Sequence, residues 1–251
     1  MNIIGISGKK QSGKDTLANF IKSYLYAKDH RETIFRQNEE GKISWEKNPN
    51  ILDISTHKMD SINTSWNIAR VYSFADTLKE FCINVLGLSK EQVYGTDKEK
   101  NTFTKYLWNN FPLSVRFRYR IKGLFTSFFR TGHMTARELM QVIGTDVGRR
   151  MFCESIWVDA TISRIKKDKP KVALIRDVRF KSEIDAIIKN GGFIIRLERK
   201  ISNDSHPSEI DLDHYDWNSL GSKCCLIHNE KCTLQEKNDM ALNFIKTVTK
   251  D

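Results

Sequence analysis

Residues 2–16 read NIIGISGKKQSGKDT, and this stretch indicates the fold class. Its first part, NIIGIS, is a short run rich in β-branched residues, which is typical of a buried strand. Its second part nearly matches the phosphate-binding loop pattern G-x-x-x-x-G-K-[ST], except that Asp15 replaces the hydroxyl residue and Thr16 follows one position late. Apolar side chains then recur at helical spacing, at Leu17, Phe20, Ile21, Tyr24 and Leu25. Strand, glycine loop and helix are the context that a phosphate-binding loop requires, and a chance match is the alternative.

Each part of this loop has a physical role in holding a triphosphate. Gly8 and Gly13 let the backbone turn so that its N–H groups point inward, and the following helix presents its positive N-terminal end. Lys14 supplies a mobile cation, and Thr16 offers a hydroxyl from the first helical turn. Phosphate would repel Asp15, so we expect this carboxylate to point toward a second substrate or a Mg²⁺ shell. Thr16 and Asp15 are therefore the candidate Mg²⁺ ligands, directly or through water.

The composition is that of a water-soluble globular chain. With 251 residues, one domain with insertions is the default expectation. No apolar run approaches the length of about 18 residues that a membrane span needs, and no signal peptide is recognisable. Five cysteines, an odd number, favour a reducing cytosol over a disulfide scaffold. The net charge of +10 fits an anionic partner, either nucleotide, nucleic acid or membrane surface.

Strands and helices alternate along much of the rest of the chain. The patterns predict a strand running into a helix over 70–86, helices over 155–167 and 181–192, and a closing helix over 233–248. They predict strands over 171–178, 193–198 and 224–229. This alternation predicts an α/β fold, a three-layer P-loop NTPase-like parallel sheet with helical insertions. The polar stretch 29–66 and the basic, aromatic stretch 102–134 are the expected insertions within a single domain, 1–251.

Several local signals mark the ends of these helices. Thr135 with Glu138, and Thr233 with Glu236, have the spacing of capping boxes. Ser182 is the expected N-cap of the helix 181–192. Two glycines, Gly144 and Gly191, are the expected helix stops.

Charged residues at two places are candidates for binding phosphate. RDVRF, 176–180, follows a buried strand at the edge where open α/β sheets bind ligands. There Arg176 and Arg179 could clamp phosphate and Asp177 could orient an acceptor or a Mg²⁺ water, and a surface salt-bridge cluster is the alternative. Arg137 opens a helix, where a cation is seldom needed, so it is a candidate phosphate ligand or an exposed surface arginine.

Two other stretches allow more than one interpretation. Cys225, His228 and Cys232 invite a zinc site, but a buried strand with packed cysteines explains them better. VRFRYRIKGLFTSFFR, 115–130, interleaves basic and aromatic residues, which suggests single-stranded nucleic acid, a membrane surface, a packed helical insertion or a lid over ATP. We favour a peripheral insertion, in which the four arginines are not essential to the reaction: Arg116, Arg118, Arg120 and Arg130.

Five segments in the same order resemble one family. The loop reads G-K-x-T, as in nucleoside monophosphate kinases, and G-K-D-T is most similar to the phage-type deoxynucleoside monophosphate kinases of that P-loop superfamily. Four further segments resemble this family: ELMQVIGTD (138–146), RDVRFKSEID (176–185), SNDSHPSE (202–209) and CLIHNEKCTLQE (225–236). The resemblance covers residues 1–27, 72–101 and 135–248.

The resemblance implies ATP-dependent phosphorylation of (deoxy)nucleoside monophosphates in nucleotide biosynthesis, with Mg²⁺. It implies catalytic roles for Lys14, Arg137 and Arg179, and ATP-binding roles for Gly8, Gly13, Lys14, Asp15, Thr16 and Asn229. It implies monophosphate-binding roles for Lys10, Leu78, Lys79, Lys98, Arg137, Gly144, Thr145, Trp157, Asp177 and Glu183. Trp157 is either a base-stacking residue or a core aromatic. His206 and Glu209 are positional or ligand-binding.

The chain departs from the family pattern at three positions. Lys98 stands where the family has arginine, which keeps the charge and loses bidentate geometry. Glu138 follows Arg137 where the family has a second arginine, and the family has no arginine at the position of Arg176.

Two rival functions remain at this point. One is a P-loop kinase for another phosphorylated metabolite, since G-K-D loops also occur in phosphomevalonate kinases. The other is a nucleic-acid-binding ATPase, which the lack of a helicase-like motif set disfavours.

We expect a nucleoside monophosphate as partner, no specific nucleic acid and no membrane span. The oligomeric state is open, with a homodimer as one alternative. The expected location is the cytoplasm, or the host cytoplasm if the chain is viral.

Overall fold

The computed structural model describes residues 1–9, 11–29, 33–47, 68–119, 121–122, 127–128, 130–198, 211–228, 230 and 232–249. The predictions for Lys10, Arg120, His206, Glu209 and Asn229 lie outside these residues. The chain divides into two compact units, the first made of Met1–Ser73 with Ile162–Asp251 and the second of Phe74–Thr161. The expectation of one kinase domain over 1–251 stays a prediction beside this division.

A five-stranded parallel sheet forms the centre of the first unit. Its strand order is β11-β10-β1-β9-β4, and every neighbouring pair is parallel. The strands are β1 (Asn2–Gly8), β4 (Ala69–Tyr72), β9 (Val172–Val178), β10 (Phe193–Glu198) and β11 (Cys224–His228). The short 3-10 helix η4 (Trp217–Lys223) leads into β11. The strands predicted from their apolar runs are confirmed.

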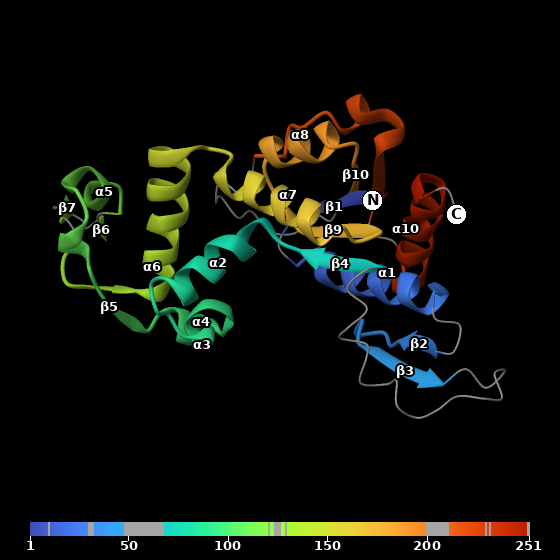
Figure 1. Cartoon of the computed structure of the whole chain (residues 1–251), viewed down its shortest axis with the longest axis horizontal. Helices are drawn as coiled ribbons and strands as arrows, with labels where there is room; N and C mark the ends of the chain where they lie inside the picture. The colour runs from blue at the N-terminus through green and yellow to red at the C-terminus, as the bar shows by residue number, and fades with distance from the viewer. Residues whose placement is uncertain are drawn as a thin grey trace. The chain divides into compact units, whose positions relative to one another are not determined.

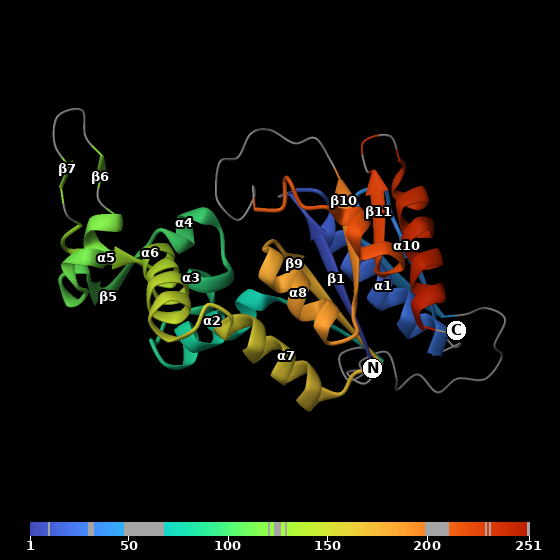
Figure 2. The same ribbon diagram turned by 90° about the horizontal axis from the view of Figure 1, so that it is seen from above.

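Helices cover both faces of this sheet (Figure 2). On one face, α1 (Lys14–Asp29) and α10 (Leu234–Thr249) bury Ile4 and Ile6 of β1. On the other, α8 (Lys181–Lys189) packs so closely that a Cβ on Gly5 would lie 2.6 Å from Ile187 Cδ1. Alternate residues of β1 therefore meet opposite layers, as a fully buried strand requires. The predicted three-layer, P-loop NTPase-like α/β class is confirmed.

The predicted polar insertion contains a β-hairpin. Strands β2 (Thr33–Gln37) and β3 (Ile43–Lys47) pair antiparallel beside α1 (Figure 1). Edge-on aromatic contacts hold the hairpin on the helix, with ring centroids 5.6 Å apart for Phe20 and Phe35 and 5.3 Å apart for Tyr26 and Trp45. Its strand β2 follows the end of α1, so the hairpin turn comes back to the start of that helix.

The second unit is built from short elements around its own core. In chain order they are α2 (Phe74–Asn84), α3 (Lys90–Tyr94), α4 (Asp97–Lys100), β5 (Phe103–Leu107), η2 (Trp108–Asn110), α5 (Leu113–Arg118), β6 (Ile121–Lys122), β7 (Ser127–Phe128), β8 (His133–Thr135), α6 (Ala136–Gln141) and η3 (Val142–Phe152). Trp108, Met134 and Leu139 are fully buried in the core. Helix α7 (Ile156–Asp168) begins in this unit and ends in the first.

The capping predictions have mixed outcomes. Both capping boxes are confirmed, since Thr135 and Thr233 accept the N–H of Glu138 and Glu236, and each glutamate accepts in return. The prediction of Ser182 as N-cap is wrong, because α8 begins at Lys181 and its N-cap is Phe180, two residues before Ser182. Gly191 has the positive φ of +74° expected just after a helix.

The prediction that Gly144 stops a helix is wrong. The chain continues from α6 directly into the π-helix η3, of which Gly144 is the third residue. Here the glycine serves close packing, because a Cβ on it would lie 2.7 Å from Leu78 Cδ2. A glycine used for close approach cannot be told from a helix stop by its sequence position.

The residues that the structure describes include no helix that could span a membrane.

The cysteines differ in burial. All five cysteines are free; Cys82 is buried and Cys153 is exposed. Burial raises the pKa of the Cys82 thiol to about 11 and that of Cys224 to about 12.

Candidate active site

The candidate phosphate-binding loop connects β1 to α1, and its lysine is held inside it. Lys14 Nζ donates to Gly8 O and Lys9 O, each at 2.5 Å, and only 8% of the residue is exposed. Gly13 has a φ of +86°, which a side chain would strain. A Cβ on Gly8 would lie 2.5 Å from Ser12 Oγ, so the loop has no room there. The sequence pattern therefore adopts the compact turn in front of a helix N-terminus that suits an anion.

The two residues after Lys14 face different neighbours. Asp15 Oδ1 lies 3.2 Å from Arg176 Nη1, so this carboxylate pairs with a residue near the end of strand β9. Thr16 lies against the hairpin turn, where a Cβ on Gly41 would come within 2.4 Å of the threonine methyl group. The hairpin thus contacts the first turn of α1, and no sequence pattern predicted this contact.

The end of β9 adds further polar groups beside the loop. Strand register pairs Ser7 with Val178, which brings Asp177 and Arg179 to the same sheet edge as the loop. Asp177 accepts a hydrogen bond of 2.5 Å from Ser73 Oγ at the end of β4. This arrangement is the convergence of strand ends that α/β sheets use to bind ligands.

Glu183, a predicted monophosphate ligand, has a defined structural contact. Its carboxylate is 2% exposed and accepts the backbone N–H groups of Arg179 at 2.7 Å and Phe180 at 3.1 Å. These bonds fix the turn between β9 and α8, and hence the backbone from which the Arg179 guanidinium extends. A direct contact of Glu183 with a nucleotide stays a prediction.

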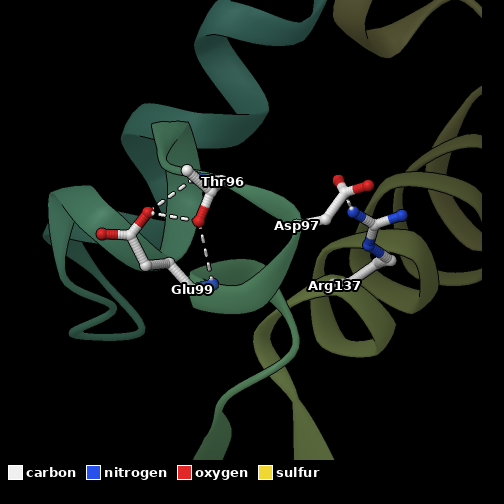
Figure 3. Close-up of polar contacts among 4 residues, drawn as sticks. All are labelled: Thr96, Asp97, Glu99 and Arg137. Atoms are coloured by element: carbon white, nitrogen blue, oxygen red, sulfur yellow. Dashed lines mark hydrogen bonds and ion pairs between the residues drawn. The ribbon is translucent and has the colours of Figure 1, made fainter.

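Arg137, in the second unit, projects from the first turn of α6 toward α4 (Figure 3). Its Nη2 lies 2.5 Å from Asp97 Oδ1, while its Nε is buried with no hydrogen-bond partner among the described residues. The capping box of Thr96 and Glu99 holds the start of α4, where Asp97 and Lys98 lie. This box therefore places an acidic partner in front of the predicted phosphate ligand.

Asp146 links the G-T-D segment to the basic stretch. This carboxylate is 1% exposed, and its Oδ1 lies 2.8 Å from Arg118 Nη2 and 3.1 Å from Arg150 Nη1. Burial, together with the nearby Asp146 carboxylate, raises the pKa of the Tyr119 phenol. Arg130 pairs with Glu138 of α6 at 3.2 Å. The basic stretch is therefore tied to α6 and η3, and Arg118 and Arg130 have structural partners.

Trp157 packs on the π-helix. It is 9% exposed, its indole N–H donates to Gly144 O at 2.8 Å, and a Cβ on Gly148 would lie 2.6 Å from its ring. Lys79 places its Nζ 4.7 Å from the centre of the Tyr94 ring. These contacts account for Trp157 as a core aromatic, and base stacking stays a prediction, as do the binding roles of Leu78, Lys79 and Thr145.

The predicted residues fall into two groups. The first unit carries Gly8, Gly13, Lys14, Asp15, Thr16, Asp177, Arg179 and Glu183. The second carries Leu78, Lys79, Lys98, Arg137, Gly144, Thr145 and Trp157. Sequence reasoning missed Lys237 of α10, whose Nζ lies 3.2 Å from the place of a Cβ on Gly13. The only signal for it was a lysine in the first turn of a helix, where a cation is disfavoured.

The donors around the loop suit one kind of metal site. In the described ranges, no group of three or more His, Cys, Asp and Glu side chains could hold an ion, which leaves the zinc alternative without support there. Cys232 instead donates to His228 O, and His228 lies 3.0 Å from Glu198. Mg²⁺ needs few protein oxygens when phosphates and waters supply the rest, and the Thr16 hydroxyl with nearby carboxylates fits that requirement.

The sheet order and the glycine loop between its central strand and α1 define a P-loop NTPase-like protein. The deoxynucleotide monophosphate kinase family model matches residues 2–222, so the chain belongs to that family. It is 26% identical to the deoxynucleoside-5'-monophosphate kinase of Escherichia phage T5 over 287 residues, covering 96% of this chain and 97% of the phage protein. It is 30% identical over 156 residues to an Acanthamoeba polyphaga mimivirus protein provisionally named deoxynucleotide monophosphate kinase, covering 56% and 67%.

Proposed function

We propose that the protein transfers the γ-phosphoryl group of ATP to a deoxynucleoside monophosphate. An oxygen of the acceptor phosphate attacks γ-phosphorus, the bond to the β,γ-bridging oxygen breaks, and ADP leaves with a deoxynucleoside diphosphate as product. The acceptor oxygen is already anionic, so no general base is required. The chain's task is then to position two anions and neutralise the charge between them.

The observation that carries this proposal is the compact loop around Lys14. The loop presents its backbone N–H groups and the positive end of α1 to the β and γ phosphates. Lys14 leaves the carbonyls of Gly8 and Lys9 and follows the transferring group. Family membership supports the assignment of this loop to a nucleotide kinase.

Three other cations have proposed roles. Arg179 extends from the turn that Glu183 fixes and binds phosphate at the edge of the sheet. Arg137 exchanges its partner Asp97 for the acceptor phosphate, and Lys98 adds charge on the same side of the second unit. A preorganised cation of this kind typically stabilises the transition state by about 2–4 kcal/mol.

Mg²⁺ fits the oxygen donors described above. When bound, it neutralises the charge on the β and γ oxygens. Thr16 would supply a direct oxygen, and Asp177 and Asp15 would hold its waters. The Ser73 hydrogen bond orients the Asp177 carboxylate for this role.

The test is a panel of acceptors. Full-length protein is incubated with ATP and Mg²⁺ and with each deoxynucleoside and nucleoside monophosphate in turn, and diphosphate formation is measured. We expect transfer to at least one deoxynucleoside monophosphate and none in Lys14→Ala. Transfer only to another phosphorylated metabolite, or ATP hydrolysis stimulated by DNA without transfer, would overturn the proposal. Near-normal turnover in a folded Lys14→Ala variant would overturn the role of the loop.

A further inference from the structure

A cavity of about 330 Å³ lies between helix α1 and the hairpin of β2 and β3. Small-molecule sites typically have volumes of roughly 300–1,000 Å³, so this cavity is large enough for a small ligand. The helix contributes residues at spacings of three, four and seven, which share one face of α1. We call it the hairpin cavity, and its described lining is Asn19, Lys22, Ser23 and Tyr26 of α1 with Gly41, Lys42, Ile43 and Trp45 of the hairpin.

The lining of the hairpin cavity combines cationic, hydroxyl and aromatic groups. Lys22 comes from the helix wall and Lys42 from the hairpin wall. Ser23 and Tyr26 are 7% and 6% exposed, so they form a buried floor. The Trp45 ring lies beside this floor, with its centroid 5.3 Å from that of Tyr26. Lysines bind phosphate as point charges and aromatic faces accept flat rings, so the cavity suits an anion that carries a ring.

The carboxylates of the neighbouring elements are directed elsewhere. Glu46 lies on the opposite face of β3 from Trp45, where it pairs with Arg36 at 3.1 Å. Asp15, at the start of α1, pairs with the end of β9. The described residues of the lining therefore include two lysines and no carboxylate. A concave surface lined by one sign of charge concentrates ligands of the opposite sign.

The hairpin cavity is separate from the phosphate-binding loop. Lys22 follows Lys14 by eight residues on α1, which is roughly 12 Å along the helix axis at 1.5 Å per residue. One phosphate group cannot contact lysines that far apart. An anion held by Lys22 would thus be a different group from the phosphate held by Lys14.

The turn of the hairpin connects the cavity to the loop. Gly41 lines the cavity, and a Cβ on it would lie 2.4 Å from the methyl group of Thr16. Asn38 fixes this turn, because its backbone oxygen accepts the N–H of Gly41 and its side-chain oxygen accepts the N–H of Lys42, each at 2.8 Å. A ligand held by Lys42 therefore meets a turn whose adjacent residue packs on Thr16.

We propose that the hairpin cavity is a regulatory site for a nucleoside phosphate, separate from both substrate sites. The phosphate oxygens bind Lys22 and Lys42, the Ser23 hydroxyl donates to them, and the base lies against Trp45. Occupancy holds the hairpin turn against Thr16, which preorganises the loop for ATP. Binding at the cavity is independent of the proposed function, and the effect on ATP rests on it.

Calorimetry measures the binding, on full-length protein that carries Lys14→Ala to weaken the donor site. Each of the four deoxynucleoside triphosphates is titrated in turn, and we expect at least one to bind. Adding Lys22→Gln with Lys42→Gln should raise its Kd by about tenfold or more, because two charge-assisted contacts are lost. The matched control is Lys166→Gln with Lys167→Gln, which removes the same charge from exposed residues of α7 and should leave the Kd unchanged.

Two results would overturn the site. One is that no triphosphate binds, and the other is that the Kd is the same with and without the Lys22 and Lys42 changes. Both are read in protein without the Lys14 ammonium, so they do not depend on phosphoryl transfer.

A second comparison tests whether the base is recognised. Inorganic tripolyphosphate should bind the same protein about tenfold more weakly than the nucleotide, since it lacks a ring to stack on Trp45. Trp45→Leu should weaken the nucleotide to a similar extent, and Trp45→Phe should recover part of the affinity. Equal affinity for tripolyphosphate and nucleotide would make the cavity a polyanion site and overturn the nucleotide assignment, with no variant at Trp45 required.

The regulatory effect is measured on protein with Lys14 intact. The triphosphate that binds competes with ATP at the donor site in every variant, so the comparison between variants isolates the cavity. With this triphosphate present, the KM for ATP should be about threefold or more lower in the parent than in Lys22→Gln with Lys42→Gln. Equal KM values would overturn the regulation. Absence of transfer in the parent would instead overturn the proposed function and leave the binding result standing.

Discussion

The Asp15 carboxylate of the candidate phosphate-binding loop lies 3.2 Å from the Arg176 guanidinium near the end of β9. This pair answers the question that an acidic residue raises beside a proposed phosphate site. The arginine lies at the sheet edge and neutralises Asp15 there. Asp15 is 74% exposed and Arg176 37%, so the pair itself contributes little to folding stability.

Arg176→Gln should therefore weaken ATP binding more than it weakens the fold. It leaves the charge of Asp15 facing the phosphates, and we expect the KM for ATP to rise by about tenfold. Asp15→Asn alone should raise the KM less, because an asparagine oxygen can still hold a water of Mg²⁺, and the double variant should recover most of the loss. A double-mutant cycle on the KM for ATP measures this coupling. Equal losses in Arg176→Gln and in the double variant would show that Arg176 contacts the nucleotide itself.

Arg137→Ala should reduce kcat/KM for the monophosphate. We expect the loss to correspond to about 2–4 kcal/mol of activation free energy, as loss of a preorganised cation does. Asp97→Asn is the matched control, because it removes the same ion pair and leaves the arginine available. We expect Asp97→Asn to keep its activity or to bind the monophosphate more tightly. Steady-state kinetics with varied monophosphate checks both, and equal losses in the two variants would make the ion pair structural.

Arg118→Gln should lower the stability of the second unit. It removes one partner from the buried Asp146 carboxylate, which costs about 1–3 kcal/mol. Arg36→Gln is the control, since it breaks an ion pair in which both residues are well exposed, and should change stability by less than about 1 kcal/mol. Urea unfolding of both variants measures the difference. The dispensability of the basic stretch for the reaction stays a prediction, and Arg118 has to be tested apart from the other arginines.

The capping box of α4 gives a prediction on pH. Hydrogen bonds from the backbone and side chain of Thr96 lower the pKa of the Glu99 carboxyl below its usual value of 4.5. A lowered folded-state pKa means that ionised Glu99 stabilises the fold above pH 4.5 and stops doing so as pH falls through the folded value. Glu99→Gln should thus be less stable than the parent at pH 7, with the gap closing below about pH 4.5. Thermal unfolding across this range checks it, and a gap independent of pH would contradict the charge effect.

Much of the first unit could be predicted because its signals are local. Apolar runs such as 172–175 specify buried parallel strands, and the boxes at Thr135 and Thr233 mark helix starts through residues three positions apart. The order of these elements implied the sheet and its ligand-binding edge. Family membership then fixed the class of reaction.

Other features depended on contacts between residues distant in sequence. The spacing of Gly144 resembles a helix stop, but its reason is Leu78, 66 positions earlier. Lys237 was overlooked because Gly13, which lies near it in the fold, is far from it in sequence, and no local pattern links them. The hairpin at 33–47 was not predicted because its two strands are short. Each has too few alternating apolar residues to indicate a β-strand. These features depend on packing and pairing between residues far apart in the chain, which local sequence patterns do not reveal.

The uneven burial of the thiols makes Cys153 a natural attachment point for a spectroscopic label. Thiolates are the reactive form, so the raised pKa values of Cys82, Cys224 and Cys225 slow their alkylation at neutral pH. Cys153 is exposed, directly follows η3 and lies in the unit that carries Arg137. Cys232, in the first unit, is partly exposed, so in a Cys232→Ser variant a fluorophore on Cys153 would report on the second unit.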